Sequence, residues 1–141
     1  MRQEVNIYCD GGGNKGTIGC WGWIAYGPEG APLEKQGGLL PKKASNNDAE
    51  YTAVLQALKW AWDNYEVVTV REVFTDSYLV VQQVNGTWKC NSPRLDGFRV
   101  SVHQLMHLLE VKQLTWVSRE QNTEADKVGR MLREEAVKND R

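Results

Sequence analysis

The 141-residue sequence lacks any long apolar run. A membrane-spanning helix needs about 18 or more mostly apolar residues in succession, and no stretch approaches that length. The opening segment Met1–Glu4 also lacks the hydrophobic core of a signal peptide. We therefore expect no membrane span and a cytoplasmic location.

Cysteine and histidine are scarce. The three cysteines, Cys9, Cys20 and Cys90, show no CxxC spacing and leave an odd one, so we interpret them as free thiols. His103 and His107 stand four residues apart on a predicted helix, which is a possible metal-binding spacing. Zinc sites need three or four protein ligands, and nothing suggests a third here, so we do not expect a zinc site.

An excess of basic residues is also absent, since 17 lysines and arginines face 18 acids and the net charge is −1. Proteins that bind polyanions usually rely on local positive charge, so this balance counts mildly against such a ligand. The objection weakens if the acids gather at a metal site and the bases lie elsewhere. Any binding to a polyanion is then expected to be weak and sensitive to salt.

The hydrophobic pattern predicts one α/β domain over residues 1–141. Apolar runs bounded by glycine and proline predict strands at 3–10, 20–26, 32–40, 67–74 and 114–117. Helical periodicity predicts helices that begin at 45, 76, about 94 and about 122. The order β-β-β-α-β-α-α-β-α indicates a mixed sheet with helices packed on it.

Four carboxylates stand at the ends of elements or on inward faces: Asp10, Glu50, Asp76 and Asp126. Glu50 is the hardest to explain structurally, because it lies on the apolar stripe of a helix, where an unpaired charge is costly. Acids placed in this way in several separate segments suggest one shared cation site. Hard divalent cations take oxygen ligands, and two held close together can hydrolyse a phosphodiester.

Each acid taken alone also has a purely structural interpretation. Asp76 could cap the helix that follows it, Asp126 could form a capping box with Thr123, and Asp10 could be an ordinary turn residue. All of these interpretations would have to coincide, so the shared site is the stronger hypothesis.

Four segments resemble the active-site motifs of type 1 ribonuclease H, in the order of that family: Tyr8–Gly12, Asn46–Glu50, Phe74–Ser77 and Asn122–Asp126. The resemblance covers nearly the whole chain. It implies the ribonuclease H-like fold, with a five-stranded mixed sheet of three antiparallel and then two parallel strands, flanked by helices.

The resemblance also implies an activity, namely metal-dependent cutting of the RNA strand of RNA–DNA hybrids. Asp10, Glu50, Asp76 and Asp126 would be catalytic and would bind two Mg²⁺ ions, for which Mn²⁺ can substitute. The products would carry 5′-phosphate and 3′-hydroxyl ends. The partner would be the hybrid itself, and we expect a monomer without an obligate protein partner.

Residues that would touch the hybrid carry over from the same resemblance. Gly11 and Gly12 would let the backbone approach RNA 2′-hydroxyls. Ser45 resembles a DNA-phosphate contact, although with Asp48 it also forms a potential capping box, and Trp88 resembles a DNA-channel residue, although it could be core. The candidate contacts are Gly11, Gly12, Asn14, Ser45, Asn46, Asn47, Ser77, Trp88, Lys89 and Asn122.

The loop before Asp126 departs from the common form of the family. That form carries a glycine- and histidine-bearing loop, whereas Val117–Asn122 has no histidine and resembles a compact archaeal and bacterial variant with Arg-Glu. The resemblance suggests that Arg119 or Glu120 shuttles a proton or assists product release. The alternative is a solvated loop with no catalytic part.

Two other functions fit parts of the pattern. One is a DNA-acting nuclease or integrase of the same fold, but proofreading exonucleases begin with Asp-x-Glu and this chain has Asp10-Gly11-Gly12. The other is a catalytically inactive hybrid-binding module, which would have no need of four acids.

Overall fold

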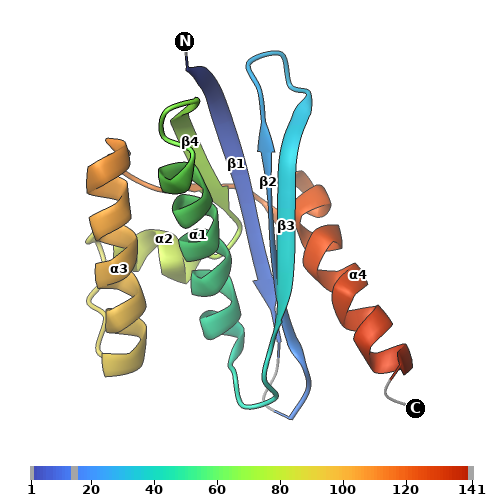
Figure 1. Cartoon of the computed structure of the whole chain (residues 1–141). Helices are drawn as coiled ribbons and strands as arrows, with labels where there is room; N and C mark the ends of the chain where they lie inside the picture. The colour runs from blue at the N-terminus through green and yellow to red at the C-terminus, as the bar shows by residue number, and fades with distance from the viewer. Residues whose placement is uncertain (1, 14–15, 140–141) are drawn as a thin grey trace.

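The computed structural model describes residues 2–13 and 16–139, which form a five-stranded sheet in the order β3-β2-β1-β4-β5, with helices on both sides (Figure 1). The strands are β1 (Gln3–Gly12), β2 (Gly19–Tyr26), β3 (Pro32–Leu40), β4 (Val68–Thr75) and β5 (Thr115–Trp116). The helices are α1 (Asn46–Asp63), α2 (Tyr78–Val84), α3 (Pro93–Leu109) and α4 (Thr123–Asn139), with a short 3₁₀ turn, η1 (Arg119–Gln121), before α4.

The sheet is mixed in the predicted way. Strand β2 pairs antiparallel with both β1 and β3, whereas β1 with β4 and β4 with β5 are parallel. The predicted ribonuclease H-like fold is therefore confirmed. In the parallel pair Cys9 lies opposite Thr75, so the carboxyl ends of β1 and β4 reach the same edge of the sheet. This register brings Asp10 and Asp76 together.

The main core lies between the sheet and α1. Alternate residues of β1, Val5, Ile7 and Cys9, are buried, as period-two alternation requires. Helix α1 buries four alanines, Ala49, Ala53, Ala57 and Ala61. Its backbone comes so close to β1 that a Cβ on Gly11 would lie 2.2 Å from the Ala49 carbonyl carbon. The absence of a side chain at position 11 thus sets how closely α1 rests on the end of β1.

Helix α4 covers the other face of the sheet, on the side away from α1 and α3 (Figure 1). It lies directly on strand backbone, because glycines line the contact on both sides. A Cβ on Gly22 would be 2.8 Å from the Gly129 nitrogen, one on Gly129 would be 2.9 Å from the Trp21 carbonyl oxygen, and one on Gly37 would be 2.9 Å from Val128 Cγ1 of α4. These glycines, which together form the glycine seam of α4, fix the helix beside the end of β1.

Several element boundaries differ from the sequence-based prediction. Strand β1 continues to Gly12, because its pairing with β2 extends to Cys20, so Asp10 lies inside the strand. The helix expected from Asp76 begins at Tyr78, since Ser77 caps it. All three cysteines are free, as predicted. Among the helices of residues 2–13 and 16–139, none is both long and apolar enough to cross a membrane.

Candidate active site

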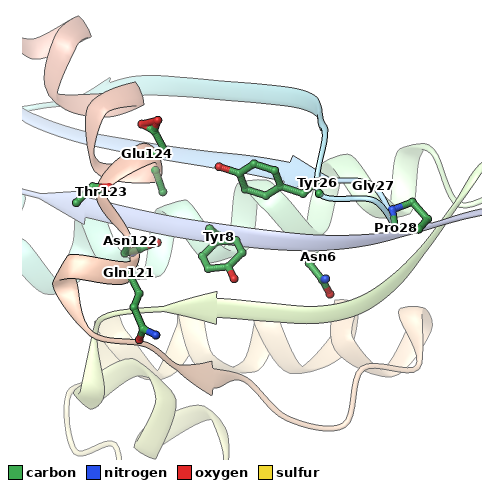
Figure 2. Close-up of a pocket in the computed structure, with 11 residues that line it drawn as sticks. Asn6, Tyr8, Tyr26, Gly27, Pro28, Gln121, Asn122, Thr123 and Glu124 are labelled. Atoms are coloured by element: carbon green, nitrogen blue, oxygen red, sulfur yellow. The ribbon is translucent and has the colours of Figure 1, made fainter.

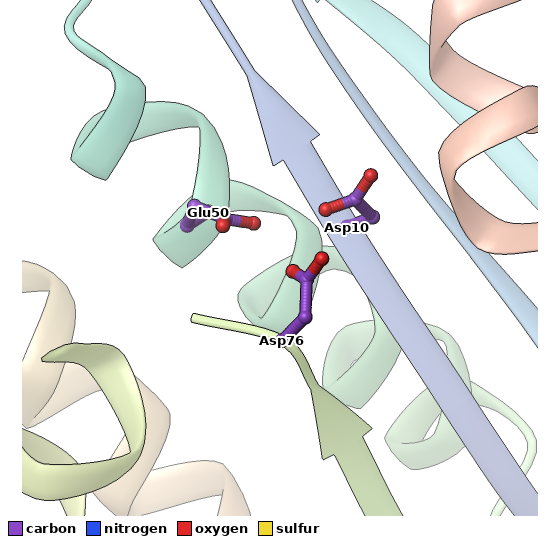
Figure 3. Close-up of side chains that lie close together, drawn as sticks. All are labelled: Asp10, Glu50 and Asp76. Carbon is purple, nitrogen blue, oxygen red and sulfur yellow. The ribbon is translucent and has the colours of Figure 1, made fainter. Parts of the chain in front are cut away.

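Three of the four predicted acids converge at the edge where β1 and β4 end. Carboxylate oxygens of Asp10, Glu50 and Asp76 all lie within 4.8 Å of one another, and they come from β1, α1 and the residue after β4 (Figure 3). The predicted convergence of these three acids is confirmed. We refer to them as the acid cluster.

Glu50 is held by the backbone of the glycine segment, Gly11–Gly13, at the end of β1. Its side chain is 7% exposed, and its Oε1 accepts a hydrogen bond of 2.7 Å from the Gly11 N–H. The start of α1 is fixed by the predicted capping box, in which Asp48 N–H donates to Ser45 Oγ at 3.1 Å and Ser45 N–H donates to Asp48 Oδ2 at 2.8 Å. The capping box of α1 and the Gly11 N–H together fix the position of the Glu50 side chain at the end of β1.

Asp76 is positioned through its backbone. The Trp116 indole Nε1 donates to the Asp76 carbonyl oxygen at 3.2 Å. The alternative that Asp76 caps α2 is wrong, because Ser77 Oγ accepts from the Val80 N–H at 3.3 Å. Within the described residues, Asp76 Oδ1 is buried without a hydrogen-bond partner. A buried carboxylate oxygen without a donor is costly unless a cation or a water molecule satisfies it.

The electrostatics of the acid cluster favour a bound cation. Burial, and then the charges of Glu50 and Asp76, raise the pKa of Asp10 to about 10. Burial and the Asp76 charge raise the pKa of Glu50 to about 8, although the Gly11 N–H, Asp10 and the positive charge of Arg119 partly offset that rise. Crowded carboxylates therefore retain protons when no cation is present. All-oxygen ligands, an orphaned oxygen and mutual repulsion together fit a hard divalent cation.

Asp126 stands at the border of the acid cluster and is not one of its mutually close members. It lies near enough to Asp10 to contribute to the raised pKa of that residue, and its Oδ2 accepts from Arg130 Nε at 3.0 Å on the next turn of α4. It still faces the same cleft, whose volume is about 380 Å³. The cleft is lined by Asp10, Gly11, Gly12, Asn46, Glu50, Asp76, Arg119, Thr123 and Asp126.

The cleft includes several of the predicted contact residues and one that the sequence analysis did not select. Gly11, Gly12 and Asn46 line it, as does Arg119 from the loop. Thr123 lines it too, and its position within the fourth motif was a signal that could have identified it. Glu120, Lys89 and Asn47 are not among the lining residues, and Asn14 lies outside the described residues.

Two further predicted contacts have clear structural settings. Trp88 is 45% exposed and packs edge-to-face against Tyr78 with ring centroids 5.4 Å apart, so the alternative that it belongs to the core is wrong. Ser77 is buried and serves as the cap of α2. A direct contact of Ser77 with substrate stays a prediction that its burial does not favour.

Asn122 is turned away from solvent behind the acid cluster. It is 2% exposed, and its Nδ2 donates to the Cys9 carbonyl oxygen at 2.8 Å, one residue before Asp10. It borders a separate cavity of about 400 Å³ that Tyr8 and Tyr26 also line (Figure 2). Its geometry supports positioning of β1, and a direct substrate contact stays a prediction that its burial does not favour.

Comparison with known proteins agrees with this geometry. Residues 9–132 match the family described as reverse transcriptase-like. Ribonuclease HI of Halobacterium salinarum is 34% identical over 87% of this chain and 61% of that protein. A bifunctional protein of Mycobacterium tuberculosis is 31% identical over 89% of this chain. The chain spans only about 34% of that protein's length.

Solved structures give the same result. The N-terminal RNase H domain of the Mycobacterium tuberculosis protein superposes with a TM-score of 0.84 at 26% identity, covering 99% of both chains. LC11-RNase H1 in complex with an RNA/DNA hybrid superposes with a TM-score of 0.81 at 28% identity, covering 94% of this chain and 99% of that one. With the sheet order and the acid cluster described above, these matches place the chain in the reverse transcriptase-like family as a ribonuclease H1-like domain.

Proposed function

We propose that the protein hydrolyses the RNA strand of RNA–DNA hybrids with the help of two divalent cations. The observation that carries the proposal is the acid cluster, in which three carboxylates from separate elements lie within 4.8 Å of one another. Family membership supports the reaction class, and the hybrid bound to LC11-RNase H1 supports the choice of substrate.

The residues of the cleft would have different roles in this reaction. Asp10, Glu50 and Asp76 would hold the cations, with Asp126 as a fourth ligand on the α4 side. Mg²⁺, or Mn²⁺ in its place, would supply an activated water and charge stabilisation at the leaving 3′ oxygen, which leaves 5′-phosphate and 3′-hydroxyl ends. Gly11 contributes by fixing Glu50 through its N–H.

The test is incubation with labelled RNA–DNA, DNA–DNA and RNA–RNA duplexes, with and without Mg²⁺. We expect cutting of the RNA strand of the hybrid alone, only with the metal, and none by Asp10→Asn. Equal cutting of the DNA–DNA duplex would favour the DNA-nuclease alternative. Tight hybrid binding without cutting would favour the inactive binding module.

A second expected result separates the two charged residues of the loop. Arg119 lines the cleft and its charge acts on Glu50, whereas Glu120 is not among the lining residues. Arg119→Ala should therefore lower kcat on the hybrid by about tenfold to a hundredfold, within the range for losing one electrostatic or proton-transfer group. Glu120→Ala should stay near wild type. Single- and multiple-turnover assays make the comparison. If both variants cut the hybrid at the wild-type rate, the loop has a structural role only.

A further inference from the structure

Arg133, on the third turn of α4, lies beside the glycine segment that borders the acid cleft. Its Nη1 is 3.9 Å from the place where a Cβ on Gly12 would stand, and among the described residues other than Gly11–Gly13 it is the nearest heavy atom to that point. Its positive charge also acts on the Cys20 thiol, opposite Gly12 in the β1–β2 pair, and it partly offsets the rise in the pKa of Cys20 that burial causes. The guanidinium therefore lies over the end of β1.

The same face of α4 runs from the acid cleft to Arg133. Asp126, Arg130 and Arg133 are spaced by four and three residues, so they share one side of the helix. Asp126 lines the cleft, and the glycine seam holds α4 against the strand backbone. Arg133 is thus a fixed neighbour of the site and not a residue of a loosely attached helix.

Arg130 and Arg133 differ in how their charges are used. Arg130 donates to Asp126 at 3.0 Å and to Glu134 at 3.1 Å, so its charge is neutralised within the protein. Arg133 is half-buried and makes no ion pair with any residue of 2–13 or 16–139. With a net charge of −1 the whole protein offers little attraction to a polyanion, so an arginine without an ion pair beside Gly12, which lines the cleft, can contribute substantially to phosphate binding.

The chemistry at this position suits a phosphate. A guanidinium offers a planar fork of donors that matches phosphate oxygens, and Gly12 has no side chain to keep a nucleic-acid backbone away. A strand that crosses the acid cluster and passes Gly11 and Gly12 would bring a neighbouring phosphate to Arg133. Under the proposed function, the strand that crosses the acids is the RNA strand.

We propose that Arg133 is a substrate-binding residue that contacts a phosphate of the RNA strand next to the scissile one. The proposal rests on the proposed function for the identity of the strand. The phosphate contact itself depends only on the geometry around Gly12. Arg133 makes no contact with the reacting atoms in this proposal, so its loss should affect binding more than chemistry.

The test measures hybrid affinity as a function of salt, in the Asp10→Asn background so that the substrate stays intact. The logarithm of the binding constant falls with the logarithm of the salt concentration, and each neutralised phosphate adds about 0.7–0.9 to the steepness of that fall. Arg133→Ala should therefore make the dependence on salt less steep by nearly one. Arg133→Lys should retain most of the slope. Arg2→Ala is the matched control, because Arg2 is exposed beside the opposite end of β1, and it should leave the slope unchanged.

The outcomes separate the two proposals. If the protein with Asp10 cleaves hybrid but Arg133→Ala has the slope of the Asp10→Asn parent, Arg133 is not a phosphate contact and the proposed function stands. If no hybrid is cut but Arg133→Ala still makes hybrid binding less dependent on salt, the phosphate contact stands and the proposed function fails. A protein that binds no hybrid at all overturns both. Thermal unfolding of each variant shows whether the fold is retained. In the protein with Asp10, Arg133→Ala should raise KM for the hybrid and leave kcat nearly unchanged.

Discussion

Asp10→Asn is expected to abolish hybrid cleavage and, in the same molecule, to stabilise the metal-free fold by about 1 kcal/mol or more. Folding forces Asp10, Glu50 and Asp76 into one cluster, and without a cation their charges repel. The amide keeps nearly the same shape and is neutral at every pH, so folding no longer has to bear this repulsion or relieve it by taking up a proton at position 10. It also removes a metal ligand, on which the reaction's main electrostatic support depends.

The pH dependence of stability should reveal the same strain. The pKa of Asp10 is raised to about 10 in the fold, so the metal-free folded state keeps a proton that the unfolded chain releases near its ordinary pKa of about 4. The free energy of unfolding is therefore highest at acid pH, as far as this group is concerned, and declines as pH rises through that window. Asp10→Asn should flatten this decline, since it removes the group.

The measurement is thermal unfolding from pH 5 to 9, in chelator and in millimolar Mg²⁺. Mg²⁺ must displace the retained protons, so its stabilising effect on wild type should grow with pH and should be smaller in Asp10→Asn. Asn46→Ala is a useful comparison, because it alters an exposed residue of the same cleft without changing its charge. A metal-free melting point of Asp10→Asn below that of wild type would contradict the strained acid cluster.

Gly11→Ala should be among the most destabilising substitutions that add only one methyl group. The added Cβ would lie 2.2 Å from the carbonyl carbon and oxygen of Ala49 and 2.6 Å from the Glu50 nitrogen. These are backbone atoms, so no side-chain rotation relieves the overlap and α1 must move away from β1. We expect a loss of about 3 kcal/mol or more, at or above the usual cost of overpacking, because the clash is with a helix backbone.

Gly12→Ala is the matched control for stability, since the nearest atom to its Cβ would be the flexible end of Arg133 at 3.9 Å. Urea unfolding should show a large fall in the midpoint for Gly11→Ala and a small change for Gly12→Ala. Calorimetric titration should also show weaker Mg²⁺ binding by Gly11→Ala, because Glu50 moves with α1. Similar midpoints for the two variants would mean that α1 yields easily.

The part of the site that sequence alone predicted is the part in which acids interrupt an apolar pattern. Asp10 and Asp76 were placed at the ends of predicted strands and Glu50 on a buried stripe, which suggested one shared site. The parallel pairing that brings the two strand ends together was implied by the resemblance to type 1 ribonuclease H and not by the pattern alone. Sequence patterns could not place Asp126 outside the mutually close group, because its ion pair with Arg130 depends on side-chain rotamers.

Other features required the tertiary structure. Asp76 and Ser77 are both good capping residues, and only the geometry of the turn shows that Ser77 takes that role. The exposure of Trp88 depends on where the segment after α2 meets the surface. The importance of Arg133 arises from the glycine seam, where Gly22 and Gly129 meet although they are far apart in sequence.

The distribution of the acid cluster over β1, α1 and β4 has a consequence for how the protein opens locally. A cation held by all three elements would be released whenever any one of them detaches, so its binding energy would oppose each of those separate openings. Backbone amides of β1, α1 and β4 should then exchange with deuterium more slowly in Mg²⁺, with a similar gain in protection in all three elements. The last turns of α4 hold none of the three acids, and their amides should exchange at nearly the same rate with and without the metal.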